Sequence, residues 1–167
     1  MWVEYPMRRI QLKISDLARV ADITRFQADG LLEEVFSSRP LGKKGAGSHR
    51  IFTPQELLVF VVAHEVEQKH GVKRSVLALA GEGLRQALNK PRQANREARL
   101  LLTFTPTSVT YLEADAHVEE GLVVRLGPLF AKADQYLGVT GQDRESTAIL
   151  PLRPVIATSR RGSSRGR

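Results

Sequence analysis

The chain has 167 residues, of which 42% are hydrophobic and 26% charged, so it can build one packed domain with a small appendage. It contains no cysteine, which excludes disulfide scaffolds, cysteine nucleophiles and thiolate metal sites. The longest apolar run, residues 57–63, is too short to span a bilayer, and the first residues lack the layout of a secretory signal. We therefore expect a cytoplasmic protein that does not bind membranes.

The net charge of +7 is unevenly distributed along the chain. Residues 1–99 hold 17 Lys and Arg against 11 Asp and Glu, and residues 100–150 hold 3 against 7. Residues 151–167 hold five Arg and no acidic residue. A basic body, an acidic segment and a basic tail indicate separate surfaces, one of them suited to a polyanion such as nucleic acid.

The first part of the chain predicts two short helices in close succession. Residues 10–14 alternate apolar and polar and predict a short strand. Ser15 is the expected N-cap of a first helix, with Asp16 in its first turn. Thr24 is a second N-cap, and the helix after it has an apolar stripe made of Ala28, Leu31, Leu32 and Val35. Because only residues 22–24 separate the two helices, we expect them to cross steeply, as in a helix-turn-helix unit.

Residues 37–50 predict a loop or hairpin that is rich in glycine and in cations. Thr53-Pro54-Gln55-Glu56 combines a Thr cap, a Pro at the first helical position and a Glu three residues after the cap, which predicts a third helix. We expect this helix to end at Gly71. A fourth helix follows over residues 73–88, weakened in its middle by Gly81 and Gly83.

Beyond residue 88 the apolar period changes to that of strands. Residues 100–105 and 108–113 predict a hairpin, and residues 122–126 predict a third strand. Gly127-Pro128 opens a final helix that we expect to end near residue 138. A sheet this small cannot bury enough apolar surface alone. It must pack on the N-terminal helices or pair with a second copy of itself, and the charge contrast favours the second arrangement.

Several segments carry a resemblance to a known family. Residues 14–18 read ISDLA and precede Ile23-Thr24 at the expected turn, and after the basic loop residues 47–57 read GSHRIFTPQEL and residues 70–77 read HGVKRSVL. In this order the segments resemble the winged helix-turn-helix DNA-binding domain of MerR-type regulators, over about half of the chain. Two family features are missing: the Arg-Tyr-Tyr cluster of the second helix, where residues 27–31 read QADGL, and the long coiled-coil dimerisation helix after residue 88.

The expected fold class is α+β, and the expected organisation has four parts. A mostly helical winged helix-turn-helix DNA-binding domain covers residues 8–88, as the resemblance implies, and residues 89–98 form a linker. A small β-hairpin and helix module covers residues 99–150, and residues 151–167 form a basic disordered tail. Because the coiled-coil helix of the family is missing, we expect the module to join two chains into a homodimer.

The expected DNA contacts follow from the docking of helix-turn-helix proteins, whose second helix enters the major groove. Arg25 can pair with guanine, Gln27 can pair with adenine, and Phe26 can contact a thymine methyl group. The cationic loop suits phosphate contacts, because glycine allows a close approach of the backbone. The expected DNA-binding residues are Thr24, Arg25, Phe26, Gln27 and Asp29 on the second helix and Arg39, Lys43, Lys44, His49 and Arg50 on the loop.

Catalytic and metal-binding motifs are incomplete in this sequence. Residues 42–48 have the wrong order for a nucleotide-binding Walker loop, and the segment from His64 lacks the second His of a zinc protease motif at the required spacing. His117 with Glu119 and Glu120 would make a weak metal site without supporting groups. We expect no enzymatic activity, no cofactor and no bound metal.

Three functions stay open at this point. The leading one is a sequence-specific DNA-binding protein, a MerR-like transcriptional regulator of bacterial or phage origin that is associated with the nucleoid when bound to double-stranded DNA. The second is an architectural DNA-binding factor of the excisionase or partition accessory type. The third is a protein-interaction adaptor whose winged domain no longer binds DNA, favoured by the missing Arg-Tyr-Tyr cluster and the acidic module. The operator sequence and any small-molecule effector are not encoded in a readable pattern.

Overall fold

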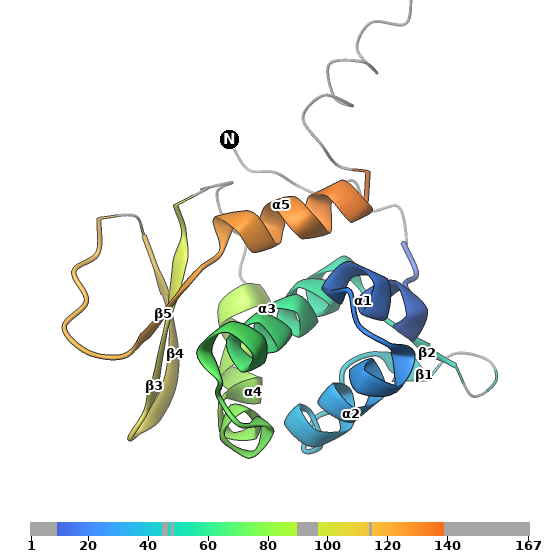
Figure 1. Cartoon of the computed structure of the whole chain (residues 1–167), viewed down its shortest axis with the longest axis horizontal. Helices are drawn as coiled ribbons and strands as arrows, with labels where there is room; N and C mark the ends of the chain where they lie inside the picture. Colours follow the sequence, from blue (N-terminus) through green and yellow to red (C-terminus); the bar gives the residue numbers. More distant parts are fainter. Residues whose placement is uncertain (1–9, 45–46, 48, 90–96, 114, 139–167) are drawn as a thin grey trace, which may run out of the picture.

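The computed structural model describes residues 10–44, 47, 49–89, 97–113 and 115–138. Over these residues the fold is α+β, with five helices and two small antiparallel sheets (Figure 1). None of the described helices has both the length and the apolar character needed to cross a membrane. Most of the expected linker, the expected module beyond residue 138 and the expected basic tail lie outside the described residues.

Helices α1 (Ile14–Ala21) and α2 (Arg25–Val35) are joined by a tight turn. Asp22 ends α1 in the left-handed conformation with φ of 57°, which Asp tolerates better than most residues. The expected N-cap at Ser15 is wrong, because α1 begins one residue before it and its N-cap is Lys13. The carboxylate of Asp16 accepts the Lys13 backbone N–H at 2.6 Å, a charge-assisted bond that draws the start of the helix to this position.

The expected strand over residues 10–14 is reduced to a single bridge. Leu12 and Phe52 exchange two backbone hydrogen bonds of 3.0 and 2.8 Å. The hairpin beside them consists of β1 (Lys43–Lys44) and β2 (Arg50–Ile51), with Lys43 opposite Ile51. Because β1 and β2 have only two residues each, they offer few backbone groups for pairing. Residues 10–14 therefore do not form a longer third strand beside them.

Helix α3 (Pro54–His70) is the centre of the molecule, and its capping was correctly predicted. The Thr53 hydroxyl accepts the Glu56 N–H at 3.2 Å, and the Glu56 carboxylate accepts the Thr53 N–H at 2.9 Å. Residues 57–63 are buried without a break, because α1, α4 and α5 all pack on this helix. Gly71 ends α3 in the left-handed conformation with φ of 64°, as expected.

Helix α4 (Arg74–Asn89) contains two glycines in its middle. The sequence predicted that they weaken the helix, and in the structure they also allow close packing. A Cβ added at Gly81 would lie 2.9 Å from the carbonyl oxygen of Val35, at the end of α2. A Cβ added at Gly83 would lie 2.9 Å from a methyl carbon of Val109. The absence of a side chain at these positions lets α4 approach α2 on one side and the sheet on the other.

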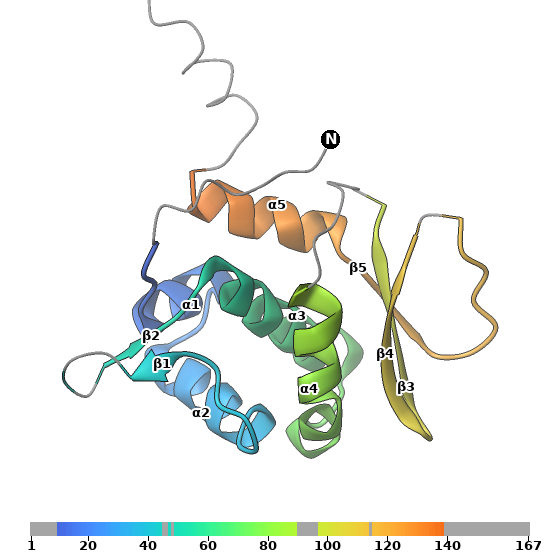
Figure 2. The same cartoon turned by 180° about the vertical axis from the view of Figure 1, so that it is seen from behind.

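The second sheet contains β3 (Arg99–Phe104), β4 (Thr107–Leu112) and β5 (Leu122–Arg125) in the order β4-β3-β5, all antiparallel. Leu100 and Leu102 of the central strand are fully buried. Helix α5 (Gly127–Tyr136) follows and crosses back over α3 and α1 (Figures 1 and 2).

One hydrophobic cluster runs through both halves of the described chain. It joins Leu84 of α4 and Val62 of α3 to Leu100 of β3 and Leu129 of α5. The inner face of the sheet is therefore covered by helices of its own chain. A homodimer is not needed to hide this apolar surface, and it stays a prediction.

Candidate nucleic-acid interface

A groove of about 370 Å³ lies where three elements meet: the start of α1, the outer side of α2 and the hairpin β1–β2. These elements lie at the end of the molecule opposite the three-stranded sheet (Figures 1 and 2). The groove is lined by Lys13, Ile14, Ser15, Arg25, Asp29, Glu33, Lys44, His49 and Arg50. The fold thus brings five expected DNA-binding residues together from two elements: Arg25, Asp29, Lys44, His49 and Arg50.

The groove is electropositive but not uniformly so. Four Lys and Arg side chains face two carboxylates, those of Asp29 and Glu33. Arg25 Nε lies 3.9 Å from Asp29 Oδ2, and both side chains are largely exposed. Exposed ion pairs of this kind contribute little to stability. Arg25 can therefore leave Asp29 and bind another acceptor at small cost.

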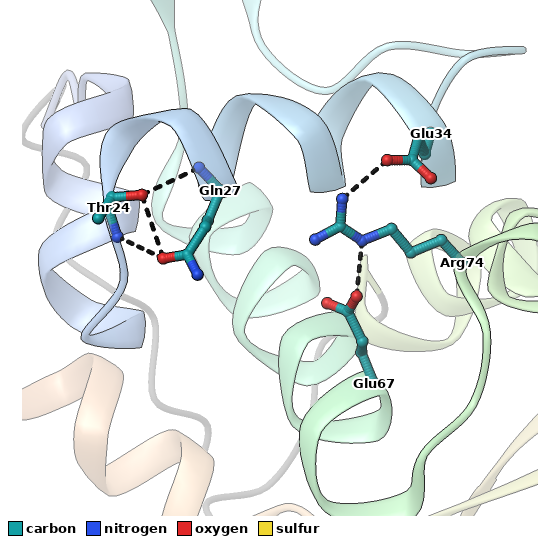
Figure 3. Close-up of polar contacts among 5 residues, drawn as sticks. All are labelled: Thr24, Gln27, Glu34, Glu67 and Arg74. Carbon is teal, nitrogen blue, oxygen red and sulfur yellow. Dashed lines mark hydrogen bonds and ion pairs between the residues drawn. The ribbon is translucent and has the colours of Figure 1, made fainter.

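Thr24 and Gln27 are engaged in the N-cap of α2 (Figure 3). The Thr24 hydroxyl accepts the Gln27 N–H at 3.2 Å, and Gln27 Oε1 accepts the Thr24 N–H at 2.9 Å. The same Oε1 accepts the Thr24 hydroxyl at 3.1 Å. A bidentate contact of Gln27 with adenine needs this oxygen as an acceptor, so base recognition by Gln27 would compete with the cap.

Phe26 stands out from the first turn of α2 with 87% of its surface exposed. The buried side of the helix, which carries Ala28, Leu31, Leu32 and Val35, points toward the core. Single exposed apolar residues are common and carry no meaning by themselves. What distinguishes Phe26 is its place in the sequence directly beside Arg25, although Phe26 itself is not among the residues that line the groove.

The loop residues divide between the groove and the body of the protein. Lys43 is exposed on β1, next to the groove residue Lys44. Arg39 is placed apart from the groove, because its guanidinium pairs with Glu82 of α4 at 2.8 Å. The neighbouring Pro40 carbonyl accepts a 3.0 Å hydrogen bond from Arg85, which holds this part of the loop on α4.

Four groove residues were not anticipated from the sequence: Lys13, Ile14, Ser15 and Glu33. A signal for the first three was present, because the first helix of a helix-turn-helix crosses the DNA backbone and Lys13 directly precedes it. Glu33 had no such signal, since its place in the groove depends on how α2 and the hairpin pack together.

Helix α2 is held in place by the side chain of Arg74 at the start of α4. Arg74 Nε donates to Glu67 of α3 at 2.6 Å, and Nη1 donates to Glu34 of α2 at 2.8 Å (Figure 3). The hydrogen bond with Glu67, together with that to Glu34, raises the pKa of Arg74 against the opposing effect of its partial burial. A Cβ added at Gly30 would lie 3.0 Å from Nη1, so α2 has a glycine where the guanidinium approaches.

Helix α5 reaches the start of α1 through one hydrogen bond. The Tyr136 hydroxyl donates to Asp16 Oδ1 at 2.5 Å, while Oδ2 accepts the Lys13 N–H. Partial burial alone would raise the pKa of Asp16, but the hydrogen bonds from Tyr136 and the Lys13 backbone outweigh it and lower the pKa. The segment that carries Lys13 and Ser15 to the groove is thus tied to the C-terminal helix.

No protein-family model matches the chain, and neither a curated protein nor a solved structure matches it. The resemblance of residues 8–88 to the MerR-type domain therefore stays a prediction.

Proposed function

We propose that the protein binds double-stranded DNA through a winged helix-turn-helix, with α2 in the major groove and the hairpin β1–β2 on the phosphate backbone. One observation carries this proposal. The start of α1, the outer side of α2 and the hairpin converge on one groove with four Lys and Arg side chains. These are the elements that contact DNA in winged helix-turn-helix proteins, where the second helix reads bases and flanking elements contact phosphates.

The side chains of the groove take different roles in this arrangement. Arg25 and Phe26 extend from the first turn of α2 toward the base edges, where Arg suits guanine and an apolar side chain suits the thymine methyl group. Lys43, Lys44 and Arg50 neutralise phosphates from the hairpin. Asp29 and Glu33 repel phosphates from the rest of α2, which restricts deep insertion to its first turn.

The cellular role that follows is regulation of transcription in a bacterial or phage system, with the protein on the nucleoid when bound. An architectural DNA-binding role uses the same contacts and differs in the bending of the DNA. The adaptor alternative is favoured by one observation, the two carboxylates that line the groove among its cations. A partner protein that carries both charge signs would suit such a groove as well.

The first experiment measures DNA binding by the full chain as a function of salt. A preferred site is selected from random DNA, and dissociation constants for that site and for random duplex are measured by fluorescence anisotropy. If about six phosphates are neutralised, the affinity falls by about three orders of magnitude between about 50 and 200 mM salt. A flat salt profile, or no binding at low salt, rejects DNA binding in favour of the adaptor.

Variants separate base reading from phosphate contact. Arg25→Ala is expected to cost about 1–3 kcal/mol on the preferred site and to relax the preference at one base pair. Lys43→Ala combined with Lys44→Ala is expected to weaken specific and random DNA about equally. Arg39→Ala is the matched control and leaves both affinities unchanged, because Arg39 pairs with Glu82 away from the groove. Equal losses on both DNAs in Arg25→Ala would show that α2 does not read bases.

A further inference from the structure

Strand β4 is an outer strand of the three-stranded sheet, and its own residues carry none of the features that commonly protect an edge. Its six residues, TSVTYL, include no charged residue and no proline. They pair one to one with β3 without a bulge, and Ser108 and Thr110 are exposed. Natural edge strands are commonly guarded by lysine, proline or bulges, because an unguarded edge is a template for another strand.

The other outer strand, β5, has a different character. It has only four residues, follows Gly121, and ends at the exposed Arg125. A short strand that ends in a cation is a poor template for pairing. Of the two edges, β4 is the one suited to accept a further strand.

Helix α4 adds an apolar side chain to the same side of the molecule. Leu79 is 69% exposed, and like Phe26 it gains meaning only from its neighbours. It lies one helical turn before Gly83, the residue that packs against Val109 of β4. Ser75 and Gln86, which are exposed on this helix side, are uncharged, and the carboxylate of Glu82 beside them is paired with Arg39. We call Ser75, Leu79, Gln86, Ser108 and Thr110 the β4 edge surface.

We propose that the β4 edge surface binds a second copy of this chain, with β4 pairing antiparallel with the β4 of the partner about a two-fold axis. The two sheets would become one continuous six-stranded sheet, and Leu79 of each copy would be covered. An antiparallel pair of identical strands is self-complementary, as a two-fold interface requires. Facing threonines and serines stabilise such a pair, and no like charges oppose each other on it.

The lack of charge on β4 suits a second copy as the occupant. None of its six residues is charged, so two copies can pair along this strand without like charges opposite each other. Residues 97–138, which include the sheet, carry only 3 of the chain's 25 Lys and Arg, so the contact lies away from most of its cations. The sheet also lies at the opposite end from the groove, which leaves both grooves of a dimer open (Figures 1 and 2).

This inference rests on the proposed function for its purpose, since two linked DNA-reading units can occupy two half-sites. Its test is independent of DNA. Light scattering of the full chain at about 10 to 100 μM, without DNA, is expected to give twice the chain mass of 18.6 kDa. A monomeric mass throughout this range overturns the inference.

Two variants locate the interface. Thr110→Lys places a cation on the edge, where the two-fold axis brings it close to its copy, and is expected to give a monomer with an unchanged circular dichroism spectrum. Leu79→Lys is expected to weaken dimerisation at least tenfold. Gln135→Lys, on the exposed side of α5, adds the same charge elsewhere and leaves the dimer intact. A folded Thr110→Lys variant that still dimerises overturns the inference. If that variant does not fold, a Leu79→Lys variant that dimerises with the same affinity as the wild-type protein overturns it instead.

The two proposals fail in distinguishable ways. A dimer that is broken by Thr110→Lys but binds no DNA leaves the interface in place and rejects the proposed function. A monomer with salt-dependent DNA binding supports the proposed function and rejects the dimer interface. If both proposals hold, Thr110→Lys keeps the affinity of the wild-type protein for a single half-site and loses the added affinity for a paired site.

Discussion

Adjacent residues in the first turn of α2 perform opposite tasks. Thr24 and Gln27 turn back on the backbone and cap the helix, which stabilises it by about 1 kcal/mol. Arg25 and Phe26, which lie between them in the sequence, are exposed. Two side chains thus fix the geometry of the turn, and the other two are free of the cap, with Arg25 lining the groove.

Phe26 provides a test of base contact that no other group in the turn can imitate. If its ring covers one thymine methyl group, replacing that thymine by deoxyuridine removes about 0.8 kcal/mol, roughly a fourfold loss of affinity. Phe26→Ala is expected to bind both DNAs equally, as measured by competition anisotropy on the preferred site. Arg25→Ala is the neighbouring control and retains the preference for thymine. Equal affinity of the wild-type protein for both DNAs would refute the contact.

We expect His64 of α3 to make the free energy of unfolding depend on pH. Its Nε2 is buried without a hydrogen-bond partner among the described residues. Burial, together with the nearby Lys132 and Arg74, lowers the pKa of His64 below its ordinary value of 6.5, although Glu67 and Glu65 oppose this. The unfolded chain therefore binds the proton more readily than the folded one. The contribution of neutral His64 to the free energy of unfolding is complete above the pKa of the unfolded chain. It decreases as the pH falls below about 6.5.

Urea denaturation at about pH 7.5 and 5.5 measures this effect. The free energy of unfolding is expected to be lower at the acidic pH in the wild-type protein, and His64→Gln is expected to lose most of that difference. His70→Gln, which replaces an exposed histidine at the end of the same helix, retains it. An equal pH dependence in the wild-type protein and His64→Gln would assign the effect to other groups.

At the scale of elements, α4 connects the two halves of the fold. Its N-terminal Arg74 binds Glu34 of α2 and Glu67 of α3. Its two central glycines admit α2 on one side and β4 on the other. A change in α4 therefore affects both the position of α2 beside the groove and the support of the sheet.

Gly81→Ala tests whether close packing or helix propensity dominates in α4. Alanine favours the helix by about 1 kcal/mol over glycine. Its Cβ would meet the Val35 carbonyl oxygen at 2.9 Å, and a backbone atom cannot move aside as a flexible side chain can. Overpacking costs about 1–3 kcal/mol. We expect a net loss of about 1 kcal/mol in the free energy of unfolding by urea denaturation.

Asn89→Ala is the control for Gly81→Ala, because it improves helix propensity at an exposed position of the same helix that lies outside the β4 edge surface. Its stability is expected to equal or slightly exceed that of the wild-type protein. A Gly81→Ala variant that is more stable than the wild-type protein would mean that α2 and α4 can separate at low cost.

At the scale of the whole molecule, local rules were predictable from the sequence and long-range contacts were not. The caps at Thr24 and Thr53 and the end of α3 at Gly71 depend on residues within one turn, so the sequence pattern contains them. The N-cap at Ser15 was mispredicted because the carboxylate of Asp16, the next residue, accepts the backbone N–H of Lys13, and the helix starts earlier.

The candidate site followed the same division. Three of its four cationic members, Arg25, Lys44 and Arg50, could be found because they lie on one helix and one glycine-rich loop. The place of Glu33 in the groove and the pairing of Arg39 with α4 could not be predicted, since both depend on packing between distant segments. The sequence left two arrangements open for the sheet and favoured pairing with a second copy, whereas in the structure helices of the same chain cover it, through contacts between distant segments such as Gly83 and Val109.

The bond between Tyr136 and Asp16 has a consequence for the synthesis of the protein. It joins residues 120 positions apart in a chain that the ribosome releases from its N-terminus. At about 5–20 residues per second, α1 waits at least several seconds for its partner. The groove beside Lys13 therefore acquires its final support only after Tyr136 has left the ribosome. A nascent chain still short of that length contains α2 but lacks the hydrogen bond that ties α1 to α5.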